Sequence, residues 1–424
     1  MTDVVQADLQ GNILCGYGRK YAHGVFLFFR VDRPHEFRRW VGAHASDITT
    51  AVPWTEEPPS TLNVALTFAG LCQLGVPARV LDSFPEDFRQ GMEARAGDLG
   101  DTGESDPAHW DERLKGLHGV MTVMAHKCSV RDERRAELEA EAVGAGLELA
   151  CVLDTDVAAD EREPFGFVDG ISQPQIRDRN AGPKQRPGEV PVAPGEFVLG
   201  YMDEGGVSSP APEQVGKSGS YMVVRKLEQD VDGFSDFLYD EAGGDSAEME
   251  WLAAKIVGRW RDGTPLVRSP YAPGGDRIDS DRLNDFSYAG DPEGYSCPIG
   301  AHIRRTNPRD SLDPEWRFTN RHRIIRRGMP YAPSAGERPG LLFVCYQACI
   351  ERQFEFVQSQ WMGDGNALGL GSDPDFIAGP AEGKMTIQGA PPRFVPMRRF
   401  ITTRGGDYFF VLGIAALGYI AALG

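Results

Sequence analysis

The sequence predicts an α+β protein made of two copies of one structural unit. Short runs rich in Val, Leu and Phe alternate with longer amphipathic or charged segments, which is typical of strands separated by helices. This order occurs twice along 424 residues, a length that suits two domains or one large duplicated domain. We therefore expect antiparallel sheets with helices on one face.

The first copy occupies the first third of the chain. Strands are expected at 24–31 (GVFLFFRV), 61–68 (TLNVALTF), 119–127 (GVMTVMAHK) and 147–154 (LELACVLD). Helices are expected between them, at 36–45 (EFRRWVGAHA), at 88–97 (FRQGMEARAG) and in the highly charged segment 131–142 (RDERRAELEAEA). Strands joined by single helices in this order predict a ferredoxin-like unit.

The same pattern returns after a stretch rich in Pro and Gly at 187–206. Strands are expected at 220–227, 340–348 and 407–414, with one amphipathic helix over 236–260 and another after residue 348. We therefore predict a duplicated ferredoxin-like fold, with an N-terminal domain at 1–200 and a C-terminal domain at 201–424.

Composition excludes several classes of partner. The chain has 62 acidic and 44 basic residues, and its net charge of -18 argues against nucleic acid. The seven cysteines lack the spacing of a disulfide framework or a zinc site and fit a reducing compartment. No secretion signal is evident, and the longest apolar run, 409–423, is too short for a membrane span. We expect a cytoplasmic protein without a membrane partner, and its oligomeric state is left open.

The first candidate for chemistry is His302, in the segment CPIGAHIRRTNPRD (297–310). An imidazole among small apolar neighbours suits an axial ligand of haem iron, and Arg304, Arg305 or Arg309 would then pair with the propionates. The alternative is a structural histidine beside a surface arginine cluster.

The second candidate is Asp169, in EPFGFVDGISQP (163–174). Gly166 and Gly170 on either side allow the backbone to approach a flat ligand closely. The phenylalanines beside the carboxyl would partly desolvate it, which suits proton transfer. An ordinary Asp-Gly turn is the alternative interpretation.

The third candidate is an arginine of RHRIIRRGMPY (321–331). Alternation along a strand would place Arg326 and Arg327 on opposite faces, one pointing inward and the other solvated. An inward arginine stays cationic and would stabilise negative charge on a peroxide oxygen. The alternative is that the basic run 317–327 is a solvated face, and we expect His322 within it to be exposed.

Together, in this order, the three segments resemble the dye-decolorising peroxidase family. Its GxxDG hallmark reads Gly166-Phe-Val-Asp169-Gly170 here, HIRRTNPR matches its proximal-histidine segment, and IIRRGMPY matches the segment of its distal arginine, Arg326. ADLQGNIL near the N-terminus and GLLF at 340–343 extend the likeness over nearly the whole chain. The resemblance implies a duplicated ferredoxin-like fold of the dimeric α+β barrel-like superfamily.

The resemblance also implies a cofactor and its site. One haem b would be held without covalent attachment, with His302 as the proximal iron ligand and Asp373 as the carboxylate partner of that histidine. Asp169 and Arg326 would act on peroxide at the opposite face. The residues expected around the haem are Gly170, Ile171, Ser172, Asn307, Arg309, Leu341 and Phe343.

The implied activity is oxidation of dyes, phenols and other aromatic reductants by hydrogen peroxide in one-electron steps. Bulky substrates would be oxidised at the surface through Trp or Tyr side chains, and surface carboxylates permit Mn²⁺ as an electron donor. Two alternatives remain open: a porphyrin-binding or haem-binding protein that acts in iron release or transport, and a haem-free α+β binding module.

Overall fold

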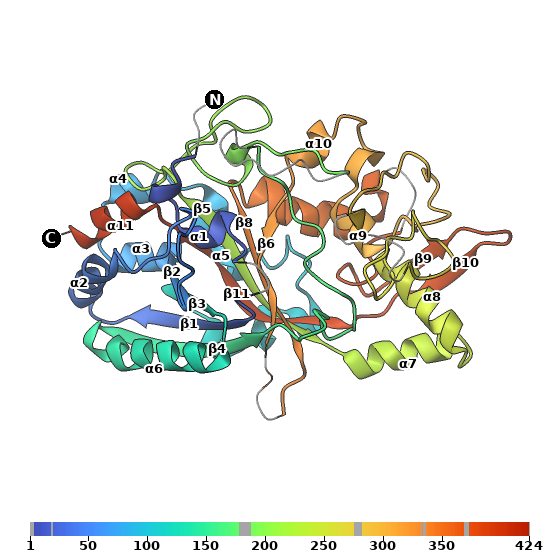
Figure 1. Ribbon diagram of the computed structural model, residues 1–424, viewed down its shortest axis with the longest axis horizontal. Helices are drawn as coiled ribbons and strands as arrows, with labels where there is room; N and C mark the ends of the chain where they lie inside the picture. The colour runs from blue at the N-terminus through green and yellow to red at the C-terminus, as the bar shows by residue number, and fades with distance from the viewer. Residues whose placement is uncertain are drawn as a thin grey trace.

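The computed structural model describes residues 4–17, 20–177, 188–274, 282–331, 333, 336–368 and 373–423 (Figure 1). The strands are β1 (His23–Val31), β2 (Ser60–Leu66), β3 (Gly119–Ala125), β4 (Leu147–Asp156), β5 (Ser220–Gln229), β6 (Ile325–Arg326), β7 (Met329–Tyr331), β8 (Gly340–Gln347), β9 (Lys384–Ile387), β10 (Arg393–Pro396) and β11 (Ile401–Val411). The α-helices are α1 (Gly11–Leu14), α2 (Pro34–His44), α3 (Phe68–Gln73), α4 (Ala78–Leu81), α5 (Glu86–Ala94), α6 (Cys128–Gly144), α7 (Val231–Glu241), α8 (Ser246–Val257), α9 (His302–Thr306), α10 (Arg317–Asn320) and α11 (Ile414–Ala421). Two π-helical segments, Glu351–Glu355 and Val357–Met362, follow β8.

Nine strands form one sheet in the order β5-β11-β2-β3-β1-β4-β7-β8-β6, and β5 also pairs with β8, so the sheet closes into a barrel. The first repeat contributes β2-β3-β1-β4, and the second contributes β11-β5-β8 with β6 and β7 as two pieces of a fourth strand. All these pairs are antiparallel, and both repeats have the strand order of a ferredoxin-like unit. The predicted duplication is therefore confirmed.

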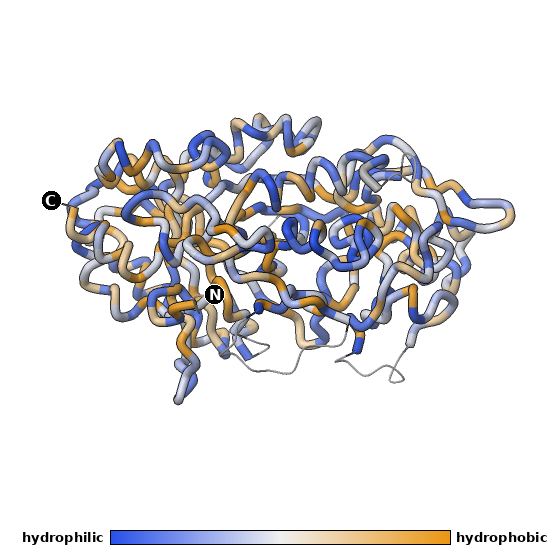
Figure 2. The backbone as a smooth tube through the Cα atoms, turned by 90° about the horizontal axis from the view of Figure 1, so that it is seen from above, coloured by the Kyte–Doolittle hydropathy of each residue, from blue (hydrophilic) through white to orange (hydrophobic). Residues whose placement is uncertain are grey.

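Strand β1 reads as a continuous apolar run because both of its faces are buried. Along β1, Phe26 and Phe28 belong to a core inside the barrel, whereas Val25, Leu27 and Phe29 belong to a core beneath the outer helices. Figure 2 shows many hydrophobic residues, in orange, in the half of the molecule that carries the C-terminus, and further ones in the other half. This double burial explains why GVFLFFRV lacks the alternation of a half-exposed strand.

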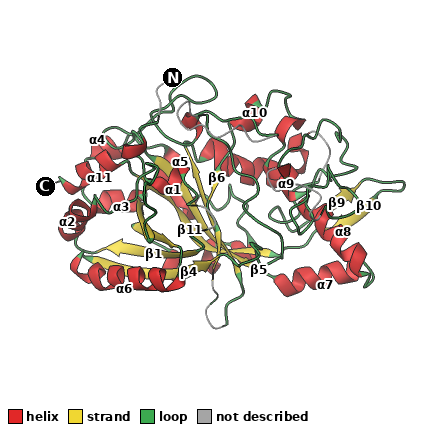
Figure 3. Cartoon of the chain, viewed as in Figure 1, coloured by secondary structure: helices red, strands yellow, loops and turns green. Residues whose placement is uncertain are grey.

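The other half of the molecule is formed by α7, α8, α9, the β9–β10 hairpin and long loops (Figure 3). The single helix expected over 236–260 is wrong, because Gly243 and Gly244 adopt left-handed φ angles of 59° and 79° and end α7. Asp245 then caps α8 by accepting hydrogen bonds from the N–H groups of Ala247 and Glu248.

Other sequence expectations concern the whole chain. The seven cysteines are free thiols. Within the described ranges, no helix is both long and apolar enough to cross a membrane. The expected boundary at 200/201 lies between β4 and β5, where the described residues form isolated β-bridges and one short 3-10 helix, Pro194–Glu196.

Candidate active site

A cavity of about 720 Å³ lies against the outer face of the second repeat, and Asp169, His302 and Arg326 all line it. Its wall includes Leu341 and Phe343 of β8, which alternate along the strand with residues of the barrel interior. The volume lies in the range of small-molecule and cofactor sites. The chain thus brings its three candidate residues to one space from three separate segments.

The loop that carries Asp169 is fixed by a partly buried carboxylate, that of Glu163. Glu163 accepts hydrogen bonds from the N–H groups of Phe165 and Phe167, each at 3.0 Å. Both rings are buried in the core beneath α7 and α8. Burial raises the pKa of Glu163, although the hydrogen bonds that it accepts oppose this. Asp169 itself accepts a hydrogen bond from the N–H of Gly170 at 2.6 Å.

His302 begins α9 and has one ring nitrogen engaged. Its Nδ1 lies 2.8 Å from Oδ2 of Asp375, whose side chain is 0% exposed. Burial lowers the pKa of His302, but the adjacent Asp375 carboxylate outweighs this and raises it. A carboxylate on Nδ1 fixes the ring orientation, so Nε2 is the nitrogen left to act as a ligand.

The expectation that Asp373 is the partner of His302 is wrong. Asp373 accepts hydrogen bonds from the N–H and the hydroxyl of Thr386, at 2.9 and 3.2 Å. Asp375 is held instead by the N–H groups of Ile377 and Ala378, both bound to its Oδ1, which leaves Oδ2 for His302. Both acids lie in one short segment, so the sequence gives no basis for choosing between them.

Arg304 and Arg305, which the sequence suggested as partners of the propionates, do not have this role. Arg304 donates to the backbone carbonyls of Asp291 and Cys297, each at 2.8 Å. Arg305 donates to the backbone carbonyl of Trp361. Both side chains are buried and neither lines the cavity, so they anchor α9 and are not available to an anionic group of a cofactor.

Six arginines line the cavity: Arg225, Arg259, Arg309, Arg323, Arg326 and Arg399. Arg225 forms a salt bridge with Asp101, and Arg399 donates to the hydroxyl of Ser105 at 2.9 Å. The other four, Arg259, Arg309, Arg323 and Arg326, form one basic wall. None of them forms a salt bridge with a carboxylate among the described residues, and Arg323 makes no side-chain hydrogen bond there. Burial and the nearby Arg309 lower the pKa of Arg259 to about 9 and that of Arg323 to about 10. Buried cations without carboxylate partners are costly, so this wall is suited to an anionic group.

Arg326 and Arg327 point to opposite sides of β6, as the strand pattern predicts. Arg326 lines the cavity and donates from Nη2 to the carbonyl of Ser172 at 3.0 Å. The expectation that Arg327 is solvated is wrong, because it donates to the carbonyl of Leu14 at 3.0 Å and packs beside α1. Burial lowers the pKa of Arg327.

Comparison with known proteins places these features in a family. The family model described as "DyP dimeric alpha+beta barrel domain" matches residues 8–157, and "Dyp-type peroxidase, C-terminal" matches residues 160–370. The chain is 31% identical to a dye-decolorizing peroxidase of Mycena epipterygia, over 100% of this chain and 88% of that protein. The chain belongs to the dye-decolorising peroxidase family.

Two other dye peroxidases are also similar to the chain. A multifunctional dye peroxidase of an Amycolatopsis species is 33% identical over 84% of this chain and 81% of that protein. A dye-decolorizing peroxidase solved in complex with 2,6-dimethoxyphenol is 26% identical, with a TM-score of 0.85 over 99% of this chain and 100% of that one. The fold and the family are thus shared along the whole chain.

The cavity of this dye-decolorising peroxidase fits haem. His302 offers an axial nitrogen, the arginine wall suits propionates, and Oδ1 of Asn307 is buried without a partner in the described part of the chain. Gly170 does not line the cavity, although the residues on both sides of it do. The other expected haem neighbours all line it: Ile171, Ser172, Asn307, Arg309, Leu341 and Phe343.

Three residues that shape the site of this peroxidase were not predicted from the sequence. They are Asp375, Arg259 and Arg323. Arg323 lies in the basic run that was considered a solvated face, and nothing in the sequence marks it as buried. Arg259 lies in Gly258-Arg259-Trp260, directly after an apolar helix, and this position is the one sequence feature that indicates its burial.

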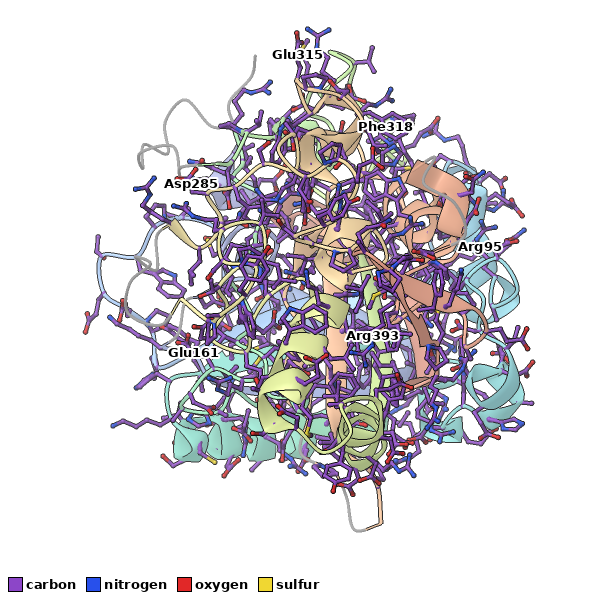
Figure 4. All side chains as sticks on the ribbon, turned by 90° about the vertical axis from the view of Figure 1, so that its right-hand side faces the viewer. Arg95, Glu161, Asp285, Glu315, Phe318 and Arg393 are labelled. Carbon is purple, nitrogen blue, oxygen red and sulfur yellow. The ribbon has the colours of Figure 1, made fainter. Side chains whose placement is uncertain are left out.

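His322 also differs from its expectation, because it is only 7% exposed. Its ring stacks on Phe356 at 4.1 Å and meets Trp361 edge-on at 5.2 Å. Its Nδ1 lies 2.5 Å from the carbonyl oxygen of Arg352, and burial lowers its pKa to about 4. Phe318 covers this cluster near the top of Figure 4 and is 46% exposed.

Proposed function

We propose that the chain is a haem b peroxidase in which His302 is the axial ligand and Asp169 and Arg326 act on hydrogen peroxide. One observation carries this proposal: His302, backed by Asp375, faces the same cavity as the carboxylate and guanidinium of those two residues. Haem bound there, with Arg309 and Arg323 near its propionates, would supply the redox-active iron at which peroxide is reduced.

The two distal residues have complementary chemistry. The Asp169 carboxylate accepts a proton from one peroxide oxygen and returns it to the other, so that water leaves. The guanidinium of Arg326 stabilises the negative charge that builds up as the O–O bond breaks. Leu341 and Phe343 form an apolar wall that excludes bulk water from this step.

The proposed reductants are dyes, phenols and related aromatic compounds. The similarity to a family member solved with 2,6-dimethoxyphenol supports this class. Bulky compounds would be oxidised at surface Trp or Tyr residues. Among the described residues, no group of three or more His, Cys, Asp or Glu side chains is arranged to hold a metal ion. We also propose a cytoplasmic location, which the seven free thiols support.

The test is peroxide-dependent oxidation of 2,6-dimethoxyphenol by protein reconstituted with haemin. Replacing Arg326 with Leu should lower kcat/KM for peroxide by about 100-fold or more while one haem per chain is retained. The exposed neighbour Arg321, replaced in the same way, is the matched control and should keep wild-type turnover.

Three other outcomes would contradict this function. A wild-type protein that binds haem without turnover would favour a role in iron release or transport. A protein without a Soret band after reconstitution would favour a haem-free binding module. Full activity in the Arg326→Leu variant would remove Arg326 from the mechanism.

A further inference from the structure

The loop that carries Asp169 is joined to Arg326 by a side-chain amide. Nε2 of Gln173 donates to the backbone carbonyl of Arg326 at 2.9 Å, and the backbone N–H of Arg326 donates to Oε1 of Gln173 at 3.1 Å. The two residues are 153 positions apart in the sequence. The amide therefore occupies the place that a neighbouring strand would take beside the two-residue strand β6.

A third hydrogen bond joins the same two segments. The guanidinium of Arg326 donates to the carbonyl of Ser172 at 3.0 Å, so backbone and side chain of Arg326 are both fixed to positions 172–173. On its other side, Arg326 is in register with Cys345 of β8. Gln173 does not line the cavity, so it touches neither a bound cofactor nor peroxide there.

We propose that Gln173 is a positioning residue for peroxide cleavage, because it sets the location of Arg326 relative to Asp169. The inference rests on the proposed function and adds to it the residue that assembles the distal pair. The Gln173 amide donates to the backbone carbonyl through Nε2 and accepts from the same residue's N–H through Oε1, and Asn, which carries the same amide, is one methylene shorter. A displacement of about 1 Å in a catalytic group is enough to cost up to about 100-fold in rate.

A matched control exists elsewhere in the chain. Gln10 makes the same double contact with Val64: its Nε2 donates to the carbonyl at 2.8 Å, and the N–H donates to its Oε1 at 2.9 Å. Gln10 is fully buried and does not line the cavity. Gln10 also donates to the carbonyl of Leu412 at 3.0 Å and accepts from the amide of Asn63 at 3.3 Å, so a change at Gln10 breaks at least as many contacts as a change at Gln173, without touching the distal pair.

The experiment compares Gln173→Glu, Gln173→Ala and Gln10→Glu by two readouts. The first is hydrogen–deuterium exchange in cofactor-free protein over a peptide that contains Arg326. Gln173→Ala removes both contacts, so it should exchange about 10-fold faster at the amide of Arg326 than wild type. An ionised glutamate at this position can still accept from the N–H of Arg326 but cannot donate to its carbonyl, so Gln173→Glu should exchange at a rate between those of Gln173→Ala and wild type. Gln10→Glu should leave that peptide unchanged even if it lowers the Tm.

The second readout is steady-state kinetics of the haemin-reconstituted variants. Both Gln173 variants should lose about 10-fold to 100-fold in kcat/KM for peroxide, with KM for the reductant unchanged and haem retained. Gln10→Glu should keep the wild-type values. Gln173→Ala carries no added charge, so it decides the matter if Gln173→Glu does not fold.

Two results would overturn the proposal. Unchanged exchange at Arg326 in both Gln173 variants would mean that the amide does not hold this strand. Faster exchange with wild-type peroxide kinetics would leave Gln173 a purely structural role. An inactive wild-type protein would instead contradict the proposed function, and the positioning role with it, so the two failures are distinguishable.

Discussion

His302 presents a single nitrogen to the cavity because Asp375 holds the other one. Asp375 is fully buried, and two backbone N–H groups bind the oxygen that does not face the histidine. A charged partner of this kind raises the electron density on the ligand nitrogen and fixes its direction. One carboxylate therefore determines both the orientation and the basicity of the proposed axial ligand.

His322 should make stability depend on pH. Its pKa is about 4 in the folded chain and ordinarily 6.5, so the folded state binds fewer protons between these values. The stability that comes from keeping the ring neutral is present above pH 6.5 and is lost as the pH falls toward 4. The free energy of unfolding can be measured with urea on cofactor-free protein at pH 7 and at pH 5. Its decrease between these two pH values should be about 2 kcal/mol smaller in His322→Phe than in wild type.

Parallel stability curves for the two proteins would contradict this. The phenyl ring keeps the packing against Phe356, so the comparison isolates the titration from the loss of a ring. A constant offset is expected, because the variant loses the hydrogen bond to the Arg352 carbonyl at every pH.

Individual residues differ in how far the sequence predicts them. Asp169, His302 and Arg326 are marked by short motifs, and the structure brings all three to one cavity. Asp373 and Asp375 are two residues apart, and which of them meets His302 depends on a turn that only the fold determines. The burial of Arg323 and His322 depends on segments distant in sequence that pack over a run of charges.

At the scale of elements, α8 and α9 meet at a glycine. Gly258 ends α8 with a left-handed φ of 95°, and a Cβ there would lie 2.5 Å from Cγ1 of Ile303 and 3.2 Å from Sγ of Cys297. Ile303 follows His302 in α9. The close approach of the two helices thus depends on the absence of a side chain at this position.

Gly258→Ala should destabilise the protein by about 2 kcal/mol and weaken haem retention, because it combines backbone strain with a clash against α9. Gly243→Ala is the matched control: it also has a positive φ, 59°, but a Cβ there meets nothing within 4 Å. Thermal unfolding and the ratio of haem to protein after gel filtration measure both effects. Equal losses in the two variants would show that packing against α9 is unimportant.

Strands that read as long apolar runs are predicted well. Strands β1, β2, β3, β4, β5 and β8 lie close to the expected positions. The strand expected at 407–414 is found at Ile401–Val411, so it begins and ends earlier than expected, and Ile414 begins α11. The sequence predicted one helix over 236–260 because the apolar pattern continues across Gly243 and Gly244, where the structure has a break between α7 and α8. The π-helical form of 351–362 has no signal in the sequence.

At the scale of the whole molecule, the two repeats complete one barrel. They meet where β11 pairs with β2 and where β4 pairs with β7, and each seam has one registered residue pair, Phe410 with Leu66 and Thr155 with Tyr331. The interior core takes side chains from the strands of both repeats. The second repeat, in turn, needs the first to cover the inner face of its sheet.

A fragment of residues 1–160 should therefore not be a folded monomer. Alone it exposes the inner face that includes Phe26 and Phe28, so it should either self-associate through that face or lack a cooperative thermal transition. Sedimentation analysis and circular dichroism test this. A monomeric fragment that unfolds cooperatively near the Tm of the full chain would contradict it.

The most direct test of the central claim is the absorption spectrum of haemin-reconstituted His302→Ala beside wild type, with peroxidase turnover measured on the same samples. We predict that wild type binds one haem per chain with a Soret band. In the variant, the Soret band should shift and weaken, and turnover should fall by about 100-fold or more. Added imidazole should restore part of both. A variant with wild-type spectrum and turnover would contradict the assignment of His302 as the iron ligand.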